Sequence, residues 1–226
     1  MNHVWILATY FMISLFMNTV KTPYLINQYD FRPSENSPGY NIMLYSDVAP
    51  TWEHDFQLLV QIFDKHRPSV PVQQFMAISE TAYPKIHFDD MNFDGFPDLG
   101  VRVFEYRGLH CRIYVYLWDN QRQRFSEEPV VIENEYELYP EQKLIELQEV
   151  HITGCWSGFF RIEGNELAFR GSVSLEHYAP DITGIRACDS ESNILYNEKR
   201  EDPNDRERYK EWWNIIFEQA ARPTGE

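Results

Sequence analysis

The chain has 226 residues, of which 43% are hydrophobic and 15% aromatic, so it can bury a sizeable core without support from disulfides. Its 35 acidic and 20 basic residues give a formal net charge of −15. Such a surface repels nucleic-acid phosphates, so the composition argues against a nucleic-acid partner and favours a basic protein partner. The same charge would also keep a chain without any partner in solution.

The amino terminus begins with an apolar segment. The first twenty residues contain no Lys, Arg, Asp or Glu, and residues 4–17 are almost all apolar. This length is typical of an export signal and is short for a bilayer span, although the usual positive residues and a small-x-small cleavage site are missing. We interpret residues 1–20 as an export signal and expect a periplasmic or secreted protein. An uncleaved anchor, which would be its only contact with a membrane, and a buried first strand are the alternatives.

Residues 21–69 are expected to form a lead-in and a helix. Residues 21–50 are rich in Pro, Ser, Asn and Tyr with little periodicity, which favours an irregular segment. Residues 52–66 have a helical apolar stripe, and Thr51 precedes them as a suitable cap. The stripe consists of Trp52, Phe56, Leu59, Val60 and Phe63.

Residues 70–180 are predicted to form a single β domain. Short segments rich in β-branched and aromatic residues alternate with turn residues, a pattern typical of an antiparallel meander, sandwich or barrel. The predicted strands are 74–79, 85–88, 100–106, 112–118, 130–132, 143–149, 158–162 and 166–174. The fold class is therefore mainly β, with one helix before the domain and another after it.

A loop inside this domain has the spacing of a calcium site. Four oxygen-bearing side chains alternate with other residues, and Gly95 follows the third of them and permits a sharp turn. Calcium prefers such oxygen ligands, so we expect Ca²⁺ as the only bound cofactor. The predicted ligands are Asp90, Asn92, Asp94 and Asp98, through their side chains, and Phe96, through its carbonyl.

The loop is not an EF-hand. Val101 stands where an EF-hand has its bidentate Glu, and strand-like segments rather than amphipathic helices flank the loop. Because Asp, Asn and Gly also dominate ordinary turns, a hairpin that needs no ion is the alternative. Because all the predicted ligands come from one short loop, the calcium site would be structural rather than catalytic. Bound calcium would stabilise the folded state by mass action.

Cys111, Cys155 and Cys188 are too few for a disulfide scaffold and lack the spacing of a metal site. After export we expect one disulfide and one free thiol, and the sequence does not choose which two cysteines pair. Buried core cysteines are the alternative for Cys111 and Cys155.

Residues 181–226 are expected to form a polar loop followed by a helix that packs on the domain. Residues 188–208 carry many charges of both signs, and residues 205–220 have one wide apolar face. That face consists of Tyr209, Trp212, Trp213, Ile216 and Phe217. A face left exposed for a partner is the alternative to packing on the domain.

The middle of the chain, about residues 72–172, resembles exported bacterial calcium-binding proteins related to lysozyme inhibitors. The resemblance rests on DDMNFDGFPDL at 89–99, YVYLWD at 114–119 and QRF at 123–125. It implies a propeller-like single β domain with bound calcium, and some members of that family are immunity proteins that block peptidoglycan-cleaving toxins. The loop alone also resembles FG-GAP calcium loops. The segments before residue 72 and after residue 178 have no counterpart in the family.

We therefore expect an exported, calcium-stabilised inhibitor of a basic, lysozyme-like cell-wall hydrolase or toxin. An inhibitory loop would plug a cleft flanked by catalytic carboxylates, and residues 154–158 and 178–184 are the candidate loops. A calcium-stabilised structural or adhesion module of the cell envelope is the alternative. An enzyme is not expected, because no nucleophile, zinc or phosphate motif is present. The pairs Glu127 with Glu128 and Glu133 with Glu135 are interpreted as surface charge.

Overall fold

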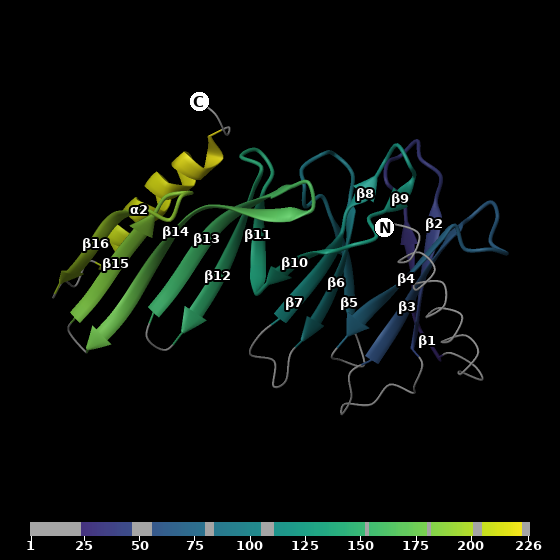
Figure 1. Ribbon diagram of the computed structural model, residues 1–226, viewed down its shortest axis with the longest axis horizontal. Coiled ribbons are helices and arrows are strands. Elements are labelled where there is room, and N and C mark those ends of the chain that lie inside the picture. The colour runs from purple at the N-terminus through teal and green to yellow at the C-terminus, as the bar shows by residue number, and fades with distance from the viewer. Residues whose placement is uncertain are drawn as a thin grey trace, which may run out of the picture. The chain divides into compact units, whose positions relative to one another are not determined.

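A computed structural model describes residues 24–46, 56–79, 84–104, 111–151, 154–179, 182–200 and 205–222 of the chain. These residues form four antiparallel sheets and one helix, α2, near the C-terminus (Figure 1). The prediction of a mainly β protein with a C-terminal helix is therefore confirmed. The chain divides into two compact units: unit 1 comprises Met1–Asp89 and Phe96–Glu127, and unit 2 comprises Asp90–Gly95 and Glu128–Glu226. The predicted export signal lies outside the described residues.

Unit 1 begins with a four-stranded sheet in the order β1-β2-β3-β4. Its strands are β1 (Tyr24–Phe31), β2 (Tyr40–Ser46), β3 (Phe56–Asp64) and β4 (Gln73–Ser79). The predicted irregular lead-in over 21–50 is wrong, because most of that segment forms the hairpin β1-β2.

The predicted helix over residues 52–66 is also wrong, because residues 56–64 form strand β3. Leu58, Val60 and Ile62 on one face of the strand are fully buried, and Leu59 on the other face is buried as well. A strand with buried apolar residues on both faces shows no strict alternation of apolar and polar residues. The cluster of apolar residues therefore matched a helical stripe by coincidence.

Unit 1 also contains β5 (Lys85–Asp89), β6 (Asp98–Phe104) and β7 (Cys111–Tyr116), which are neighbours in the order β7-β6-β5, and the two-stranded sheet of β8 (Trp118–Asp119) and β9 (Arg124–Phe125). Aromatic side chains dominate the core of this unit. The ring of Phe31 lies 5.2 Å from that of Trp118 and 5.0 Å from that of Phe125, measured between centroids. The short hairpin β8-β9 thus places two aromatic residues, Trp118 and Phe125, in the core.

Unit 2 contains β10 (Val130–Glu133) and a six-stranded meander in the order β11-β12-β13-β14-β15-β16. The strands of the meander are β11 (Glu135–Tyr139), β12 (Leu144–His151), β13 (Gly154–Glu163), β14 (Glu166–Ala179), β15 (Ile182–Cys188) and β16 (Ile194–Arg200). The predicted polar loop over 188–208 is wrong in part, because β16 forms the edge of this sheet. Its exposed residues, among them Ile194 and Leu195, hid the strand in a polar sequence.

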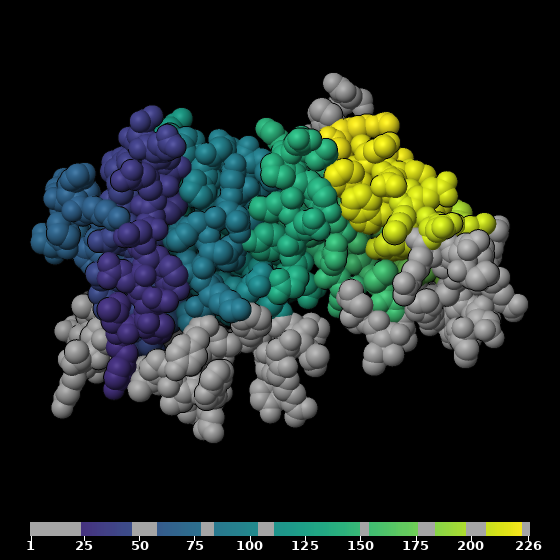
Figure 2. Space-filling view, turned by 180° about the vertical axis from the view of Figure 1, so that it is seen from behind, coloured from purple at the N-terminus to yellow at the C-terminus, as the bar shows by residue number. Residues whose placement is uncertain are grey.

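Helix α2 (Asp205–Ala221) runs along one face of this sheet (Figure 1) and lies on the molecular surface in Figure 2, where it is yellow. Ile216 and Ala220 are buried against the sheet, and the ring of Trp213 lies 5.4 Å from that of Phe159 in β13. The prediction that the helix packs on the domain is confirmed. Within the described part of the chain, no helix has the length and apolar character needed to cross a membrane.

Candidate functional site

The predicted calcium loop, residues 90–98, connects β5 to β6. The Asp90 carboxylate organises it: Oδ1 accepts a hydrogen bond from the backbone N–H of Asp94 at 3.0 Å, and Oδ2 accepts one from that of Gly95 at 2.9 Å. Gly95 has a φ of 92°, as its predicted role in a sharp turn requires. Phe93 also has a positive φ, 58°, which bulky residues rarely adopt. The carboxylate of Asp90 therefore stabilises a turn of unusual backbone conformation.

Asn92 and Asp94 are joined within the same turn. Asn92 Oδ1 accepts a hydrogen bond from the Asp94 backbone N–H at 3.1 Å, and Asn92 Nδ2 donates one to Asp94 Oδ2 at 3.0 Å. Asp90 and Asn92 are half-buried, whereas Asp94 is exposed. The structure thus brings together the first three predicted side-chain ligands.

Asp98 has a different environment. It is fully buried, and its Oδ1 accepts a hydrogen bond from the backbone N–H of Trp118 at 2.7 Å. A buried carboxylate requires such donors, because its desolvation is otherwise too costly. This contact anchors the C-terminal end of the loop to β8. No local signal in the sequence connects Asp98 with a residue twenty positions away, so this hydrogen bond could not be predicted.

A second turn, between β15 and β16, makes similar hydrogen bonds, although it lacks the full set of oxygen ligands that the loop 90–98 has. In the β15-β16 connection, Asp189 Oδ1 accepts bonds from the backbone N–H groups of Glu191 and Asn193 at 3.0 and 2.8 Å. Hydrogen bonding by the Asn193 side chain lowers the pKa of Asp189 from its ordinary value. Hydrogen bonds of this kind therefore identify a well-formed turn. They do not by themselves identify an ion site.

The residues of the loop 90–98 fit calcium by their chemistry. Each Asp90 oxygen accepts one N–H and has a further lone pair, and Asn92 and Asp94 offer oxygens once their mutual bond opens. Among the described residues, no three His, Cys, Asp or Glu side chains are gathered closely enough to hold a metal ion. Calcium binding therefore stays a prediction. Two of its predicted ligands, Asn92 and the Phe96 carbonyl, are uncharged.

Both predicted inhibitory loops lie mainly in strands. The prediction for residues 154–158 is wrong, because they form the start of strand β13, where Ser157 and Gly158 are buried. Of residues 178–184, the first two end β14 and the last three begin β15. Gly184 at the end of that segment is buried, and the side chains of residues 178–183 lie outside the described residues.

The expected disulfide is not formed, because all three cysteines are free. Cys155 in β13 and Cys188 in β15 are separated by β14, which places their backbones about 10 Å apart, beyond the ~7 Å limit for a disulfide. Cys111 is buried at the start of β7, as its alternative interpretation predicted.

The two glutamate pairs that were predicted to be surface charge are exposed in the structure. They are Glu127 with Glu128 and Glu133 with Glu135.

Comparison with solved structures finds a similar fold in a protein described as a Xanthomonas type IV secretion system related protein. The TM-score is 0.50 at 12% sequence identity, and the match covers 78% of this chain and 100% of that chain. No family model and no curated protein match the chain. At this identity the likeness shows a shared fold.

Proposed function

We propose that the chain is an exported binding protein that is stabilised by calcium and inhibits a peptidoglycan-cleaving, lysozyme-like enzyme, as an immunity protein does. The observation that carries the calcium part is the loop 90–98, in which the Asp90 carboxylate, Asn92 and Asp94 meet in one turn. Calcium would be held by the oxygens of Asp90, Asn92, Asp94 and Asp98 and by the carbonyl of Phe96. Its role is to hold the loop and the strands β5 and β6 together.

The proposed inhibition of a cell-wall hydrolase rests on the net charge and on the fold likeness. Lysozyme-like enzymes are often basic, and a net charge of −15 would steer such a partner toward this protein. The fold likeness to a protein related to a secretion system supports an exported or envelope context. Of the two candidate inhibitory segments, residues 178–184 span the end of β14 and the start of β15, whereas residues 154–158 lie within one strand.

The test is a peptidoglycan-hydrolysis assay. The purified protein is titrated into a panel of basic muramidases and glucosaminidases, with calcium at about 1 mM or with a chelator. We expect the activity of at least one enzyme to fall in proportion to the inhibitor added, with an association rate that decreases as the salt concentration rises.

Full activity of every enzyme in an excess of the protein would contradict inhibition. If calcium still raised the melting temperature in that case, the calcium-stabilised structural or adhesion module of the cell envelope would be the better description.

A further inference from the structure

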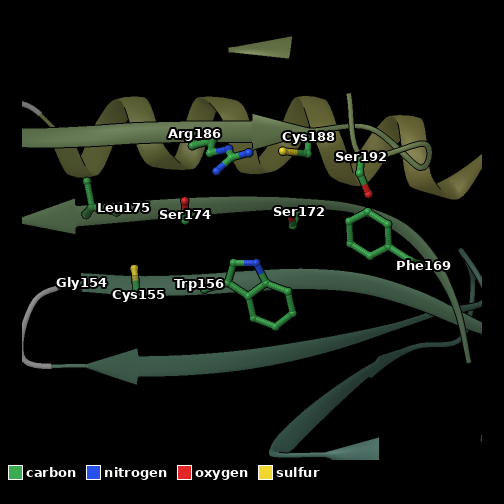
Figure 3. Close-up of a pocket in the computed structure, with 10 residues that line it drawn as sticks. All are labelled: Gly154, Cys155, Trp156, Phe169, Ser172, Ser174, Leu175, Arg186, Cys188 and Ser192. Atoms are coloured by element: carbon green, nitrogen blue, oxygen red, sulfur yellow. The ribbon is translucent and has the colours of Figure 1, made fainter. Parts of the chain in front are cut away.

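An open hollow of about 490 Å³ lies on the face of the six-stranded sheet that is opposite α2 (Figure 3). The pairing of the strands explains why it forms. Trp156 of β13, Ser174 of β14 and Arg186 of β15 are direct neighbours across the sheet. The middle residue of this row is small, whereas both outer residues are large. The row therefore leaves a depression between an indole and a guanidinium group.

The next row deepens the depression. Gly158, Ser172 and Cys188 are paired across the same three strands, and all three side chains are small. The indole of Trp156 lies over Gly158, because a Cβ atom at Gly158 would be 2.3 Å from Trp156 Cη2. Figure 3 shows this indole nearly face-on above the strands. Its outer face is thus presented to the hollow and the solvent, while Phe160 supports it through an edge contact at 6.3 Å.

The charged side chains near the hollow lie in one row across the sheet. Arg186 is exposed and makes no hydrogen bond or ion pair with any described residue, although the protein has a net charge of −15. Glu149 of β12 is paired with Trp156, and Asn197 of β16 is paired with Arg186. One row of the sheet therefore runs from an acid through an aromatic ring and a hydroxyl to a base and an amide.

We propose that this hollow binds a pyranose sugar that carries one carboxylate. The apolar face of the sugar stacks on Trp156, and the carboxylate accepts paired hydrogen bonds from the Arg186 guanidinium. The two outer residues stand on strands about 10 Å apart, which a single ring with a carboxylate arm can span. The volume is also within the range of about 300–1,000 Å³ that is usual for small-ligand sites.

The polar groups around the hollow favour a sugar over a flat aromatic acid. Ser172, Ser174 and Ser192 line the hollow. Their hydroxyls can pair with sugar hydroxyls, which an aromatic acid lacks. Glu149 repels a carboxylate at its end of the row, so the acidic group is directed toward Arg186. The proposal does not depend on inhibition of a hydrolase.

The experiment is a calorimetric titration of the full chain with four sugars. N-acetylmuramic acid and glucuronic acid carry the carboxylate, and N-acetylglucosamine and glucose are their neutral counterparts. We expect a dissociation constant on the order of 0.1–1 mM for at least one acid, and binding of its neutral counterpart at least about tenfold weaker. The acid that binds better tells whether the ligand is a wall-derived amino sugar or a uronic acid.

Two variants make the test specific. Arg186→Gln should weaken binding of the acidic sugar by about tenfold or more, whereas Lys210→Gln, which removes an exposed charge from α2, should leave it unchanged. Trp156→Leu should weaken the acidic and neutral sugars together, because it removes the stacking surface.

Arg186 is exposed, so its variant should keep the parental melting temperature. Equal affinity for acidic and neutral sugars, unchanged binding by the Arg186 variant, or no binding of either acid at about 10 mM would overturn the proposal.

Discussion

Asp94 is the exposed carboxylate of the proposed calcium loop. Its removal tests calcium binding while leaving the hydrogen bonds of the turn to Asp90 in place. The bonds that Asp90 accepts come from the backbone of Asp94 and Gly95, so Asp94→Ala leaves them in place. We expect this variant to melt close to the parent in a chelator, and to lose the increase in melting temperature that about 1 mM calcium gives the parent. Differential scanning fluorimetry measures both quantities.

Glu191 offers a matched control for this experiment. It is an exposed carboxylate in the similar turn organised by Asp189, so Glu191→Ala should retain the full response to calcium. An equal response to calcium in the Asp94 variant and the parent, or no response in the parent, would contradict the loop as a calcium site.

Glu146 is a buried carboxylate beneath α2, and we expect both of its oxygens to be needed as hydrogen-bond acceptors. Its Oε2 accepts a hydrogen bond from the Tyr139 hydroxyl at 2.8 Å, and its Oε1 accepts one from Trp213 Nε1 at 2.9 Å. In Glu146→Leu neither donor would keep its acceptor. Urea unfolding should show a loss of about 1–3 kcal/mol, whereas Glu166→Leu, at an exposed position, should change little. Equal stability of both variants would contradict this role.

At the scale of elements, Arg161 of β13 attaches the C-terminal end of α2 to the sheet. Its Nη2 donates to the carbonyl of Ala221 at 2.7 Å and to that of Gln142 at 3.1 Å. The last turn of α2 has no basic residue of its own, so this guanidinium supplies the positive charge that a helix C-terminus favours. We expect Arg161→Met to lower stability by about 1–3 kcal/mol and to speed amide hydrogen exchange in the last turns of α2.

The exposed Lys210 of the same helix provides the comparison. Lys210→Met removes a charge without removing a contact to the sheet, so hydrogen exchange in α2 should stay at the parental rate. Parental exchange in the Arg161 variant as well would show that the hydrophobic contacts of α2 hold it without this anchor.

The sequence predicted elements well where one face is buried and the other is wet. Helix α2 and the short strand β10 follow their expected periods, and their predicted positions agree with the structure. The same rule would have identified β2, whose residues Tyr40, Ile42 and Leu44 are buried in alternation, but the Pro and Ser residues before it concealed the pattern. Strand β3 lacks that alternation because Leu59 is buried on the face opposite Leu58 and Val60, so local periodicity could not distinguish it from a helix.

The candidate sites also differ in how far they could be predicted from the sequence. The loop 90–98 is local, so the positions of Asp90, Asn92 and Gly95 in one turn could be predicted from spacing alone. The bond between Asp98 and Trp118 and the row of Trp156 with Arg186 depend on which strands are neighbours and in what register. A shift of one residue would turn every side chain to the other face. The strand neighbours and their register are known only once the fold is known.

At the scale of the whole molecule, stability should decrease in alkali. Burial raises the pKa of Tyr116 in unit 1 and, in unit 2, the pKa values of Tyr139 and Tyr209. The hydrogen bond to Glu146 raises the pKa of Tyr139 further. The folded state therefore retains phenol protons that the unfolded chain releases above pH ~10. This contribution is fully present below pH ~10 and is lost progressively as the pH rises above that value.

The Tyr116→Phe variant isolates this effect from general charge repulsion. Above pH ~10 the lysines also lose their charge, and a chain that already has a net charge of −15 becomes still more acidic in the parent and in the variant alike. Urea midpoints measured between about pH 9 and 11 should therefore fall for both proteins, but less steeply for Tyr116→Phe, which has no phenol at this buried position. Parallel slopes would mean that the Tyr116 phenol does not contribute to the loss of stability in alkali. A shallower slope for the variant would identify the buried phenol as a group whose ionisation opposes folding.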